Sequence, residues 1–570
     1  MYVDRVPNRN SPPAILLRES WREDGKIRKR TLANLSDWPA EKIETLRRLL
    51  QGDELVSPKD AFAITSSRPH GHVEAVLGTM RKLGVPALLA SKPSRERDLV
   101  LAMIAERLLR PCSKLATTRL WHTTTLAEEL GVQDAQVDEL YTALDWLLAR
   151  QSRIEAKLAA RHLKDGGLVL YDASSSYYEG KTCPLARFGH DRDGKHLPVI
   201  LYGLLTDQDG RPVAVEVYPG NTGDPTTVAD QVNKLGERFG LSHIVVVGDR
   251  GMLTQPQIQK LREHPGLGWI SCLRSGSIRS LVDKGYLQRS LFDQTNLAEI
   301  QSPDFPGERL IACLNPLLAD ERGRKRQELL QATEKSLERL GREVSRRTKK
   351  KLGKAEIGLK AGRILGRYKM GKHFQLTIED GRFAWARRDD AIARERALDG
   401  IYIIRTSQPK SQLSAADAVR KYKSLAVVER AFRCLKGVDL LVRPIHHRTE
   451  GHVRAHVFLC MLAYYVEWHL RQALAPLLFH DQELDVDRTQ RDPVAPAQPS
   501  QSARRKKRTR VGDDGLPLHS FQTLLAELGT RCRNTALLKA DAAKPDGGRT
   551  IQLVTDLSPL QARAFQLLGL

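Results

Sequence analysis

The sequence lacks any hydrophobic run long enough to cross a membrane. Its longest apolar run, residues 457–466, is ended by Glu467, whereas a spanning helix needs about 20 apolar residues. The N-terminal string MYVDRVPNRNSPP has no apolar stretch after its charges, so no secretory signal is visible. We therefore expect a protein of the cytoplasm with no membrane partner.

The sequence also lacks closely spaced cysteine pairs, and it has too few acidic residues to balance its basic ones. The seven cysteines are scattered, odd in number and without a C-x-x-C pair, which disfavours a disulfide framework and a structural zinc site. Asp and Glu number 68 against 91 Lys and Arg, a formal net charge of +23. Such a surplus favours a polyanionic partner, of which nucleic acid is the commonest. The 570 residues are enough for several domains of about 150 residues each.

Helical periodicity dominates residues 72–164. Leu140, Leu144 and Leu147 follow one another at i, i+4 and i+7, which predicts a helix with one apolar stripe, and Asp134 is its expected N-cap. Before residue 60 the sequence mixes short extended stretches, such as 14–17, with a basic turn at 25–30. We expect residues 1–165 to form a mostly helical DNA-binding region.

The period changes at residue 166, where short apolar runs typical of buried strands begin. The expected order is β-β-β-α-β-α-β, with strands at 167–171, 198–205, 212–218, 244–247 and 268–273, and helices at 224–239 and 255–263. Asp224 is placed as the N-cap of the first of these helices, with Pro225 behind it. This order predicts an α/β sheet covered on both faces.

Two carboxylates follow strands of this predicted sheet. Asp172 follows the first strand, and Asp249 follows the fourth after Gly248. An aspartate at a strand end is common without any function, but two on neighbouring strands lie at one sheet edge, where ligand sites of α/β proteins gather. Such a pair is able to share hard divalent cations.

A third carboxylate lies on a predicted helix over residues 415–436. Tyr422, Glu429 and Lys436 are spaced by seven and seven residues, close to two turns per step, so all three are expected to project from one face. The alternative is a solvated helix face with an incidental charge pair.

The string YKSLAVVERAFRCLK resembles the signature Tyr-x2-Arg-x3-Glu-x6-Lys of DDE transposases in the insertion-sequence-four superfamily. The match is at Tyr422, Glu429 and Lys436, and Leu425 replaces the arginine of the family. The strings VLYDASSSYYEG, VVVGDRGM and RPIHHRTEGHVRAHVFLCMLAYYV resemble the sub-group named sixteen-thirty-four.

The resemblance implies an α/β, ribonuclease-H-like catalytic core with an inserted subdomain and the helical N-terminal region. It further implies that Asp172, Asp249 and Glu429 bind two Mg²⁺ ions, with Mn²⁺ as an alternative, for phosphodiester cleavage and transfer. Tyr422 and Lys436 would hold the DNA backbone, and Lys423 or Arg430 would replace the missing arginine. Arg433 is a further candidate for DNA binding.

The expected domains are the N-terminal region 1–165, the first part of the core at 166–274, the inserted subdomain at 275–407, the second part of the core at 408–475, a basic linker at 476–512 and a small helical segment at 513–570. We expect a DNA transposase that binds the terminal inverted repeats of an insertion sequence and works by cut and paste. The expected partners are double-stranded DNA, as transposon ends and target, and a second copy of the chain in a homodimeric synaptic complex. The expected location is the nucleoid of a bacterial cytoplasm.

Two other functions stay open. A nuclease of the same fold would cut DNA without joining it, and a catalytically inactive repressor would only bind DNA, which Leu425 favours.

Several further motifs have both a structural and a functional reading. We expect core or backbone-contact roles for the histidines at 446, 447, 452 and 456, and buried packing for Phe383 and Trp385 rather than stacking on a base. The basic stretch at 342–354 favours DNA slightly, and the basic run at 504–510 reads equally as a linker or a DNA tether.

Overall fold

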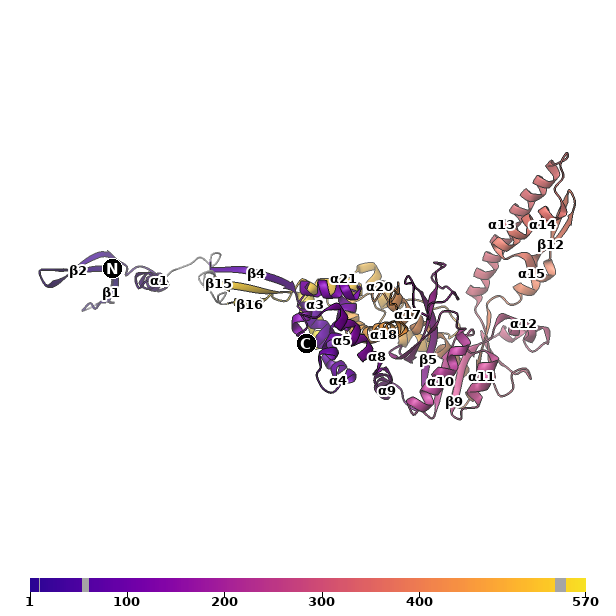
Figure 1. The fold of residues 1–570 in the computed structure, drawn as a ribbon, viewed down its shortest axis with the longest axis horizontal. Coiled ribbons are helices and arrows are strands. Elements are labelled where there is room, and N and C mark those ends of the chain that lie inside the picture. The colour runs from indigo at the N-terminus through magenta and orange to yellow at the C-terminus, as the bar shows by residue number, and fades with distance from the viewer. Residues whose placement is uncertain (10, 54–60, 539–549) are drawn as a thin grey trace. The chain divides into compact units, whose positions relative to one another are not determined.

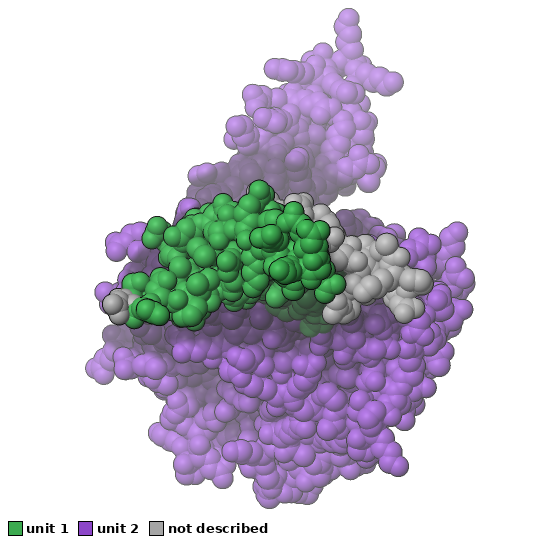
Figure 2. All heavy atoms as spheres, turned by 90° about the vertical axis from the view of Figure 1, so that its left-hand side faces the viewer, with its two compact units in different colours: residues 1–68, 532–555 green, residues 69–531, 556–570 purple. Residues whose placement is uncertain are grey.

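The computed structural model describes the chain except for residues 10, 54–60 and 539–549. The chain divides into two compact units (Figure 2). Unit 1 comprises residues 1–68 and 532–555, and unit 2 comprises residues 69–531 and 556–570. Among the described helices, none is long and apolar enough to cross a membrane. All seven cysteines carry free thiols.

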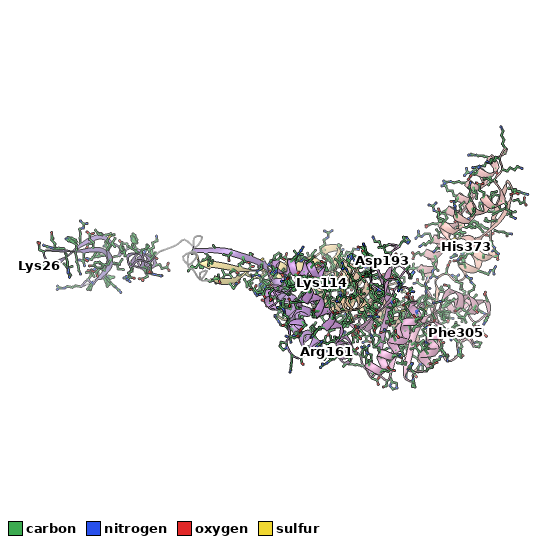
Figure 3. The ribbon with its side chains drawn as sticks, in the orientation of Figure 1. Lys26, Lys114, Arg161, Asp193, Phe305 and His373 are labelled. Atoms are coloured by element: carbon green, nitrogen blue, oxygen red, sulfur yellow. The ribbon has the colours of Figure 1, made fainter. Side chains whose placement is uncertain are left out.

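Unit 1 begins with a three-stranded antiparallel sheet of β1 (Tyr2–Val6), β2 (Ala14–Glu23) and β3 (Lys26–Asn34), followed by α1 (Ala40–Leu50). The turn between β2 and β3 is Asp24-Gly25, and both residues have positive φ, as a tight hairpin of two residues requires. The expected basic turn at 25–30 is therefore wrong for most of its length. Lys26, labelled in Figure 3, already begins β3, whose residues are all exposed.

The second sheet of unit 1 joins segments from both ends of the sequence. Its order is β16 (Thr550–Val554), β15 (Cys532–Leu538) and β4 (Phe62–Pro69). Thr65 Oγ1 donates to the carbonyl of Thr535 at 3.2 Å, across 470 residues of sequence. We expected only helices after residue 513. β15 is the central strand and pairs with both β16 and β4, and local sequence patterns carry no sign of the distant partner β4.

A helical layer opens unit 2. Its main members are α3 (Gly71–Lys82), α5 (Arg95–Leu109), α8 (Val137–Leu148), α9 (Gln151–His162) and the long α18 (Glu450–Ala473), which packs against α3, α5 and α8. Leu140, Leu144 and Leu147 are fully buried, as the predicted stripe requires. The helix begins two residues later than expected, because Gln136 is its N-cap and its N–H donates to Glu139 Oε2 at 2.9 Å, whereas Asp134 pairs with Arg95.

The core of unit 2 is an eight-stranded mixed sheet in the order β10-β11-β14-β9-β8-β5-β6-β7. The strands are β5 (Gly167–Tyr177), β6 (Val199–Asp207), β7 (Pro212–Pro219), β8 (Ile244–Gly248), β9 (Leu267–Cys272), β10 (Leu297–Ile300), β11 (Arg309–Leu314) and β14 (Ile401–Thr406). β5 runs parallel to β8, and β8 parallel to β9, while β6 and β7 are antiparallel. The predicted order of elements from 166 to 273 is present, with α10 (Val228–Asn233) and α11 (Gln255–Arg262) between strands.

The segment at 275–407 contributes to two parts of unit 2. It includes α12 (Ser275–Asp283) and adds β10, β11 and β14 to the central sheet. It also forms α13 (Pro316–Arg346), α14 (Lys354–Tyr368), the hairpin β12 (Phe374–Glu379) and β13 (Arg382–Arg387), and α15 (Asp389–Arg396), drawn in salmon and orange in Figure 1. These elements have small cores of their own, where Trp385 packs edge-on against Phe374 with ring centroids 5.7 Å apart. Phe383 is also partly buried there. Packing of these two aromatic side chains is thus as expected.

The basic run at 504–510 is mostly helical. It falls in α20 (Gln501–Thr509), and the ammonium of Lys506 is buried, donating to the carbonyl of His480 and to Gln482 Oε1, both at 3.1 Å. The other basic side chains of the run are exposed. One lysine of the run thus anchors the helix to the segment before it, and the linker and DNA-tether interpretations of the exposed cations both stay predictions.

Candidate active site

Asp172 and Asp249 occupy adjacent positions on two parallel strands. The register pairs Tyr171 of β5 with Gly248 of β8. Asp172 and Asp249 are the residues that directly follow this pair on the two strands. β5 was predicted to end before Asp172, and this prediction is wrong. The strand continues to Tyr177 against β6, and only its pairing with β8 stops at this point. The carboxyl end of β8 therefore opens a gap in the sheet beside Asp172.

Glu429 lies on α17 (Leu425–Lys436), which packs against β5 and α18. Val428, Ala431 and Leu435 form its buried face. Glu429, Arg433 and Lys436 line a cavity of about 560 Å³ together with Asp172 and Asp249. The fold thus brings the three predicted carboxylates to one cavity, across 257 residues of sequence between the first and the third (429 − 172).

Tyr422 is not on the same helix as Glu429. The helix α16 (Ala415–Lys423) ends at Ser424, whose hydroxyl donates to the carbonyl of Lys421 at 2.6 Å, and α17 starts afresh. The expected single helix over 415–436 is therefore wrong. Tyr422 instead donates its hydroxyl to Asp249 Oδ1 at 3.3 Å, so it holds one of the candidate carboxylates directly.

Burial sets the charge state of the cavity. Desolvation raises the pKa of Asp172 to about 7. The N–H of Ala173 and the guanidinium of Arg192 favour the carboxylate and oppose this rise. The neighbouring Asp249 raises this pKa further. Burial also lowers the pKa of Lys436 to about 8, although Asp193, 3.8 Å away, favours the ammonium. Lys436 donates to the carbonyl of Ser175 on β5.

The cavity contains charged residues that sequence reasoning missed. Arg192 pairs with Asp224 at 2.6 Å, and Arg443 pairs with Asp193, labelled in Figure 3. All four side chains line the cavity. Asp224 was expected as a helix N-cap, but the helical turn begins at Asp224 itself after Gly223, and its carboxylate is an ion-pair partner. The strings HDRDGKH and RPIHH contain Arg192, Asp193 and Arg443, but no periodicity in them points to a site.

The other predicted DNA-binding residues divide into two groups. Arg433 and Lys436 line the cavity, whereas Lys423 and Arg430 are not among its lining residues. Lys423 donates its ammonium to the carbonyls of Val494 and Ala495, at 3.1 and 3.0 Å, so this cation is occupied inside the fold. Arg430 is exposed on α17.

The four histidines at 446–456 do not form a metal site within the described parts of the chain. His456 is buried, and its Nε2 contacts the carbonyl of Val442 at 3.1 Å. His447 and His452 lie beside the ring of Tyr141. These contacts agree with the expected core and backbone roles of His447, His452 and His456. The same expectation is wrong for His446, which is exposed and lies 3.9 Å from Glu179.

A second acidic cluster lies behind α17. Within the described chain, Cys434, Asp439 and Glu467 form the group of metal-ligand side chains whose ligand atoms all lie within 4.8 Å of one another. Arg471 already pairs with both carboxylates there, at 2.6 Å from Glu467 and 3.0 Å from Asp439. The cluster is therefore an ion-pair network. Asp172, Asp249 and Glu429 are spread more widely.

The sequence matches two families of known proteins. Residues 164–466 match the family described as Transposase DDE domain, which is more than half of the chain, and residues 3–61 match the family described as IS1634 family transposase, N-terminal domain. The first match covers the central sheet and all three candidate carboxylates. The chain belongs to the DDE transposases. Within that class it is a member of the IS1634 group.

Membership of this family carries general consequences. A DDE transposase domain implies nuclease or transposition activity on DNA and the use of a divalent metal. No curated protein matches the chain. A solved structure titled "Cryo-EM structure of piggyBac transposase synaptic complex with hairpin DNA" is similar at a TM-score of 0.34 and 8% identity, covering 80% of this chain and 76% of that chain. A similarity this low supports no argument about this chain.

Proposed function

We propose that this protein is a cut-and-paste transposase whose catalytic carboxylates are Asp172, Asp249 and Glu429. The observation that carries the proposal is their meeting in one cavity of a chain with a DDE domain. The core then corresponds to a ribonuclease-H-like fold, which the antiparallel β5–β6–β7 and parallel β5–β8–β9 pairing supports. α13 to α15 and β12–β13 would be the inserted subdomain.

The cavity fits two divalent ions better than one. Mg²⁺ binds oxygen at about 2.1 Å, so oxygens on one ion lie no more than roughly 4.2 Å apart. The three carboxylates are more widely spread than the 4.8 Å of a compact cluster. Carboxylates with this separation would be able to contact two ions that lie about 3.5–4 Å apart, which is the spacing in two-metal sites. Carboxylate oxygens are also the hard ligands that Mg²⁺ and Mn²⁺ accept.

The carboxylates of the cavity and their polar and basic neighbours have distinct roles in this chemistry. Divalent ions, when bound, would supply activation of a water or a 3′-hydroxyl and stabilisation of the leaving oxygen of the phosphodiester. Asp172, Asp249 and Glu429 would hold them, and the hydroxyl of Tyr422 orients Asp249. Arg433, exposed at the rim, and Lys436, deeper inside, offer positive charge to the scissile phosphate and its neighbours. Arg433 thereby takes the part that the family assigns to the arginine missing at Leu425.

The test of this function separates cutting from joining. Labelled DNA carrying the ends that flank the gene is incubated with the protein in Mg²⁺ and in EDTA, and pre-cleaved ends are offered with a target plasmid. Mg²⁺-dependent cleavage together with integration is the expected result. Cleavage without integration would identify a nuclease, and tight binding without either would identify a repressor.

Joining two ends requires both in one complex, so we expect a homodimer during synapsis. Mass photometry of the protein with end DNA should give a species of two chains and two DNA molecules. End joining by a complex of one chain would contradict this expectation.

The metal requirement is expected to depend on pH through Asp172. Its pKa of about 7 means that the folded protein holds a proton on this carboxyl below neutrality, and a metal ion must displace it. The Mg²⁺ concentration for half-maximal cleavage should therefore fall about tenfold per pH unit as pH rises towards 7, and level off above about 8. Cleavage rates at several Mg²⁺ concentrations and pH values measure this. DNA binding in EDTA over the same pH range is the control, and a metal requirement that does not change would contradict the prediction.

A further inference from the structure

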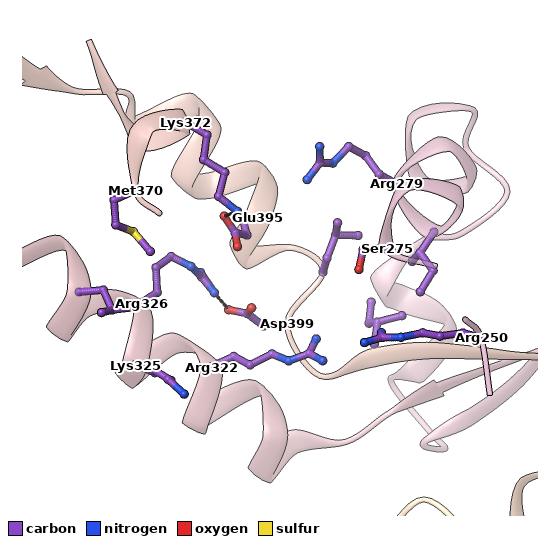
Figure 4. Close-up of a pocket in the computed structure, with 14 residues that line it drawn as sticks. Arg250, Ser275, Arg279, Arg322, Lys325, Arg326, Met370, Lys372, Glu395 and Asp399 are labelled. Carbon is purple, nitrogen blue, oxygen red and sulfur yellow. Dashed lines mark hydrogen bonds and ion pairs between the residues drawn. The ribbon is translucent and has the colours of Figure 1, made fainter. Parts of the chain in front are cut away.

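A second cavity, of about 420 Å³, lies between α12, α13 and the loop after β8. Six basic side chains line it, from Arg250, Arg279, Arg322, Lys325, Arg326 and Lys372. Figure 4 shows Arg279 reaching in from α12, while the guanidinium groups of Arg322 and Arg250 extend towards each other from opposite sides. The side chains of one charge thus converge on one space.

Two carboxylates in the wall balance only part of this charge. Asp399 pairs with Arg326, and Glu395 pairs with Lys372 at 2.7 Å. Within the described chain, Arg250, Arg279, Arg322 and Lys325 form no ion pair with a carboxylate. Four like charges facing one cavity repel one another, and an anion between them would offset that repulsion. Arginine forks bind phosphate oxygens in pairs, so phosphate is the anion that such a lining suits.

This cavity adjoins the candidate active site through one peptide. Asp249 lines the first cavity and Arg250 lines the second, and consecutive Cα atoms are only about 3.8 Å apart. Arg274 fixes the loop, since its guanidinium donates to the carbonyls of Arg250 and Gly251, both at 3.3 Å. A strand bound at the carboxylates would therefore lie within reach of the second cavity.

We propose that the cavity of Arg250, Arg279, Arg322 and Lys325 binds successive phosphates of the DNA strand that enters the carboxylate site. This rests on the proposed function, because it takes DNA as the substrate. The side chains come from the Asp249 loop, from α12 and from α13, so strand binding here would also hold α13 against the core. Free polyphosphate carries the same phosphate groups and is the other ligand that would suit this cavity. The experiment below distinguishes it from DNA.

The test compares the double variant Arg279→Ala/Arg322→Ala with Arg153→Ala/Lys260→Ala, whose residues are exposed on α9 and α11 and form no carboxylate ion pair. DNA affinity is measured by fluorescence anisotropy over a salt series. Each lost phosphate contact lowers the slope of log K against log salt by about 0.7–0.9. The cavity variant should lose between about 1 and 2 units of slope, and the matched variant should keep the wild-type slope.

A second pair of measurements locates the contact. Neutral methylphosphonate linkages are placed one at a time near the cleavage position of the DNA. Wild type should lose affinity at one or two linkages where the cavity variant loses none. Arg279→Lys/Arg322→Lys keeps the charge and should retain most of the slope, which shows that folding alone does not explain the alanine result. Thermal unfolding of every variant checks the fold.

The outcomes separate this inference from the proposed function. If wild type cleaves DNA but both double variants have the same slope, the cavity does not bind DNA. If inorganic tripolyphosphate raises the melting temperature of wild type and not of the cavity variant, while their DNA slopes coincide, the ligand is a free polyphosphate and the proposal is overturned. If wild type neither binds nor cleaves DNA, the proposed function itself fails.

Discussion

Replacing Glu429 by glutamine is expected to abolish DNA cleavage and to leave DNA binding nearly unchanged. The amide has the shape of the carboxylate but carries no charge, so it is a poor ligand for a hard divalent cation. Loss of one group that stabilises charge in a transition state costs about 10²–10³-fold in rate, and a metal ligand should cost at least as much. Glu429 is exposed on α17 and forms no ion pair in the described chain, so the fold does not depend on it.

The measurement is single-turnover cleavage of labelled end DNA in Mg²⁺, with affinity measured in EDTA. Glu338→Gln is the matched control, because Glu338 is an exposed residue of α13 outside the cavity. It should cleave at the wild-type rate. A Glu429→Gln protein that cleaves within about tenfold of wild type would remove Glu429 from the catalytic set.

Arg471→Met is expected to give the largest loss of stability. The guanidinium pairs with Glu467, which is fully buried, and with Asp439, which is 20% exposed, and it lies over the ring of Phe521. Removing one partner of a buried ion pair leaves an uncompensated charge and costs about 3–5 kcal/mol. Because Arg471 is itself 30% exposed, we expect the lower end of that range.

Chemical denaturation at fixed pH measures the change in the free energy of unfolding. Burial already raises the pKa of Glu467 to about 7, so this carboxyl takes up a proton at acidic pH and the cost of the substitution should shrink there. Arg488→Met removes an exposed pair with Asp485 and should change stability by less than about 0.5 kcal/mol. Equal losses from the two substitutions would refute the role of the network behind α17.

The central sheet and the meeting of the carboxylates are the parts that local patterns predict well. Buried strands with short apolar runs give the order of β5 to β9, and parallel pairing then places Asp172 beside Asp249. Glu429 was found by its spacing from Lys436 within one helix and by a family signature. The roles of the three carboxylates remain a prediction.

The remaining features depend on contacts far apart in sequence. The helix is interrupted at Ser424, whose hydroxyl donates to the carbonyl of Lys421, and Tyr422 before the interruption contacts Asp249, 173 residues away in sequence. Asp224 looks like a helix cap to a local pattern, but its partner Arg192 lies on another loop. Charged residues of loops have no periodicity, so their convergence appears only once the chain is folded.

The pairing of β4 with β15 has a consequence for synthesis. β4 ends at Pro69, and its partner begins at Cys532, so the ribosome must add 463 further residues (532 − 69) before the pair can form. At about 5–20 residues per second this takes roughly 25–90 s, during which the backbone groups of β4 that β15 later pairs are open. An unpaired strand edge is a template for aggregation. Premature termination before residue 532 should therefore yield products that associate through β4, and rapid completion of the chain protects the nascent protein.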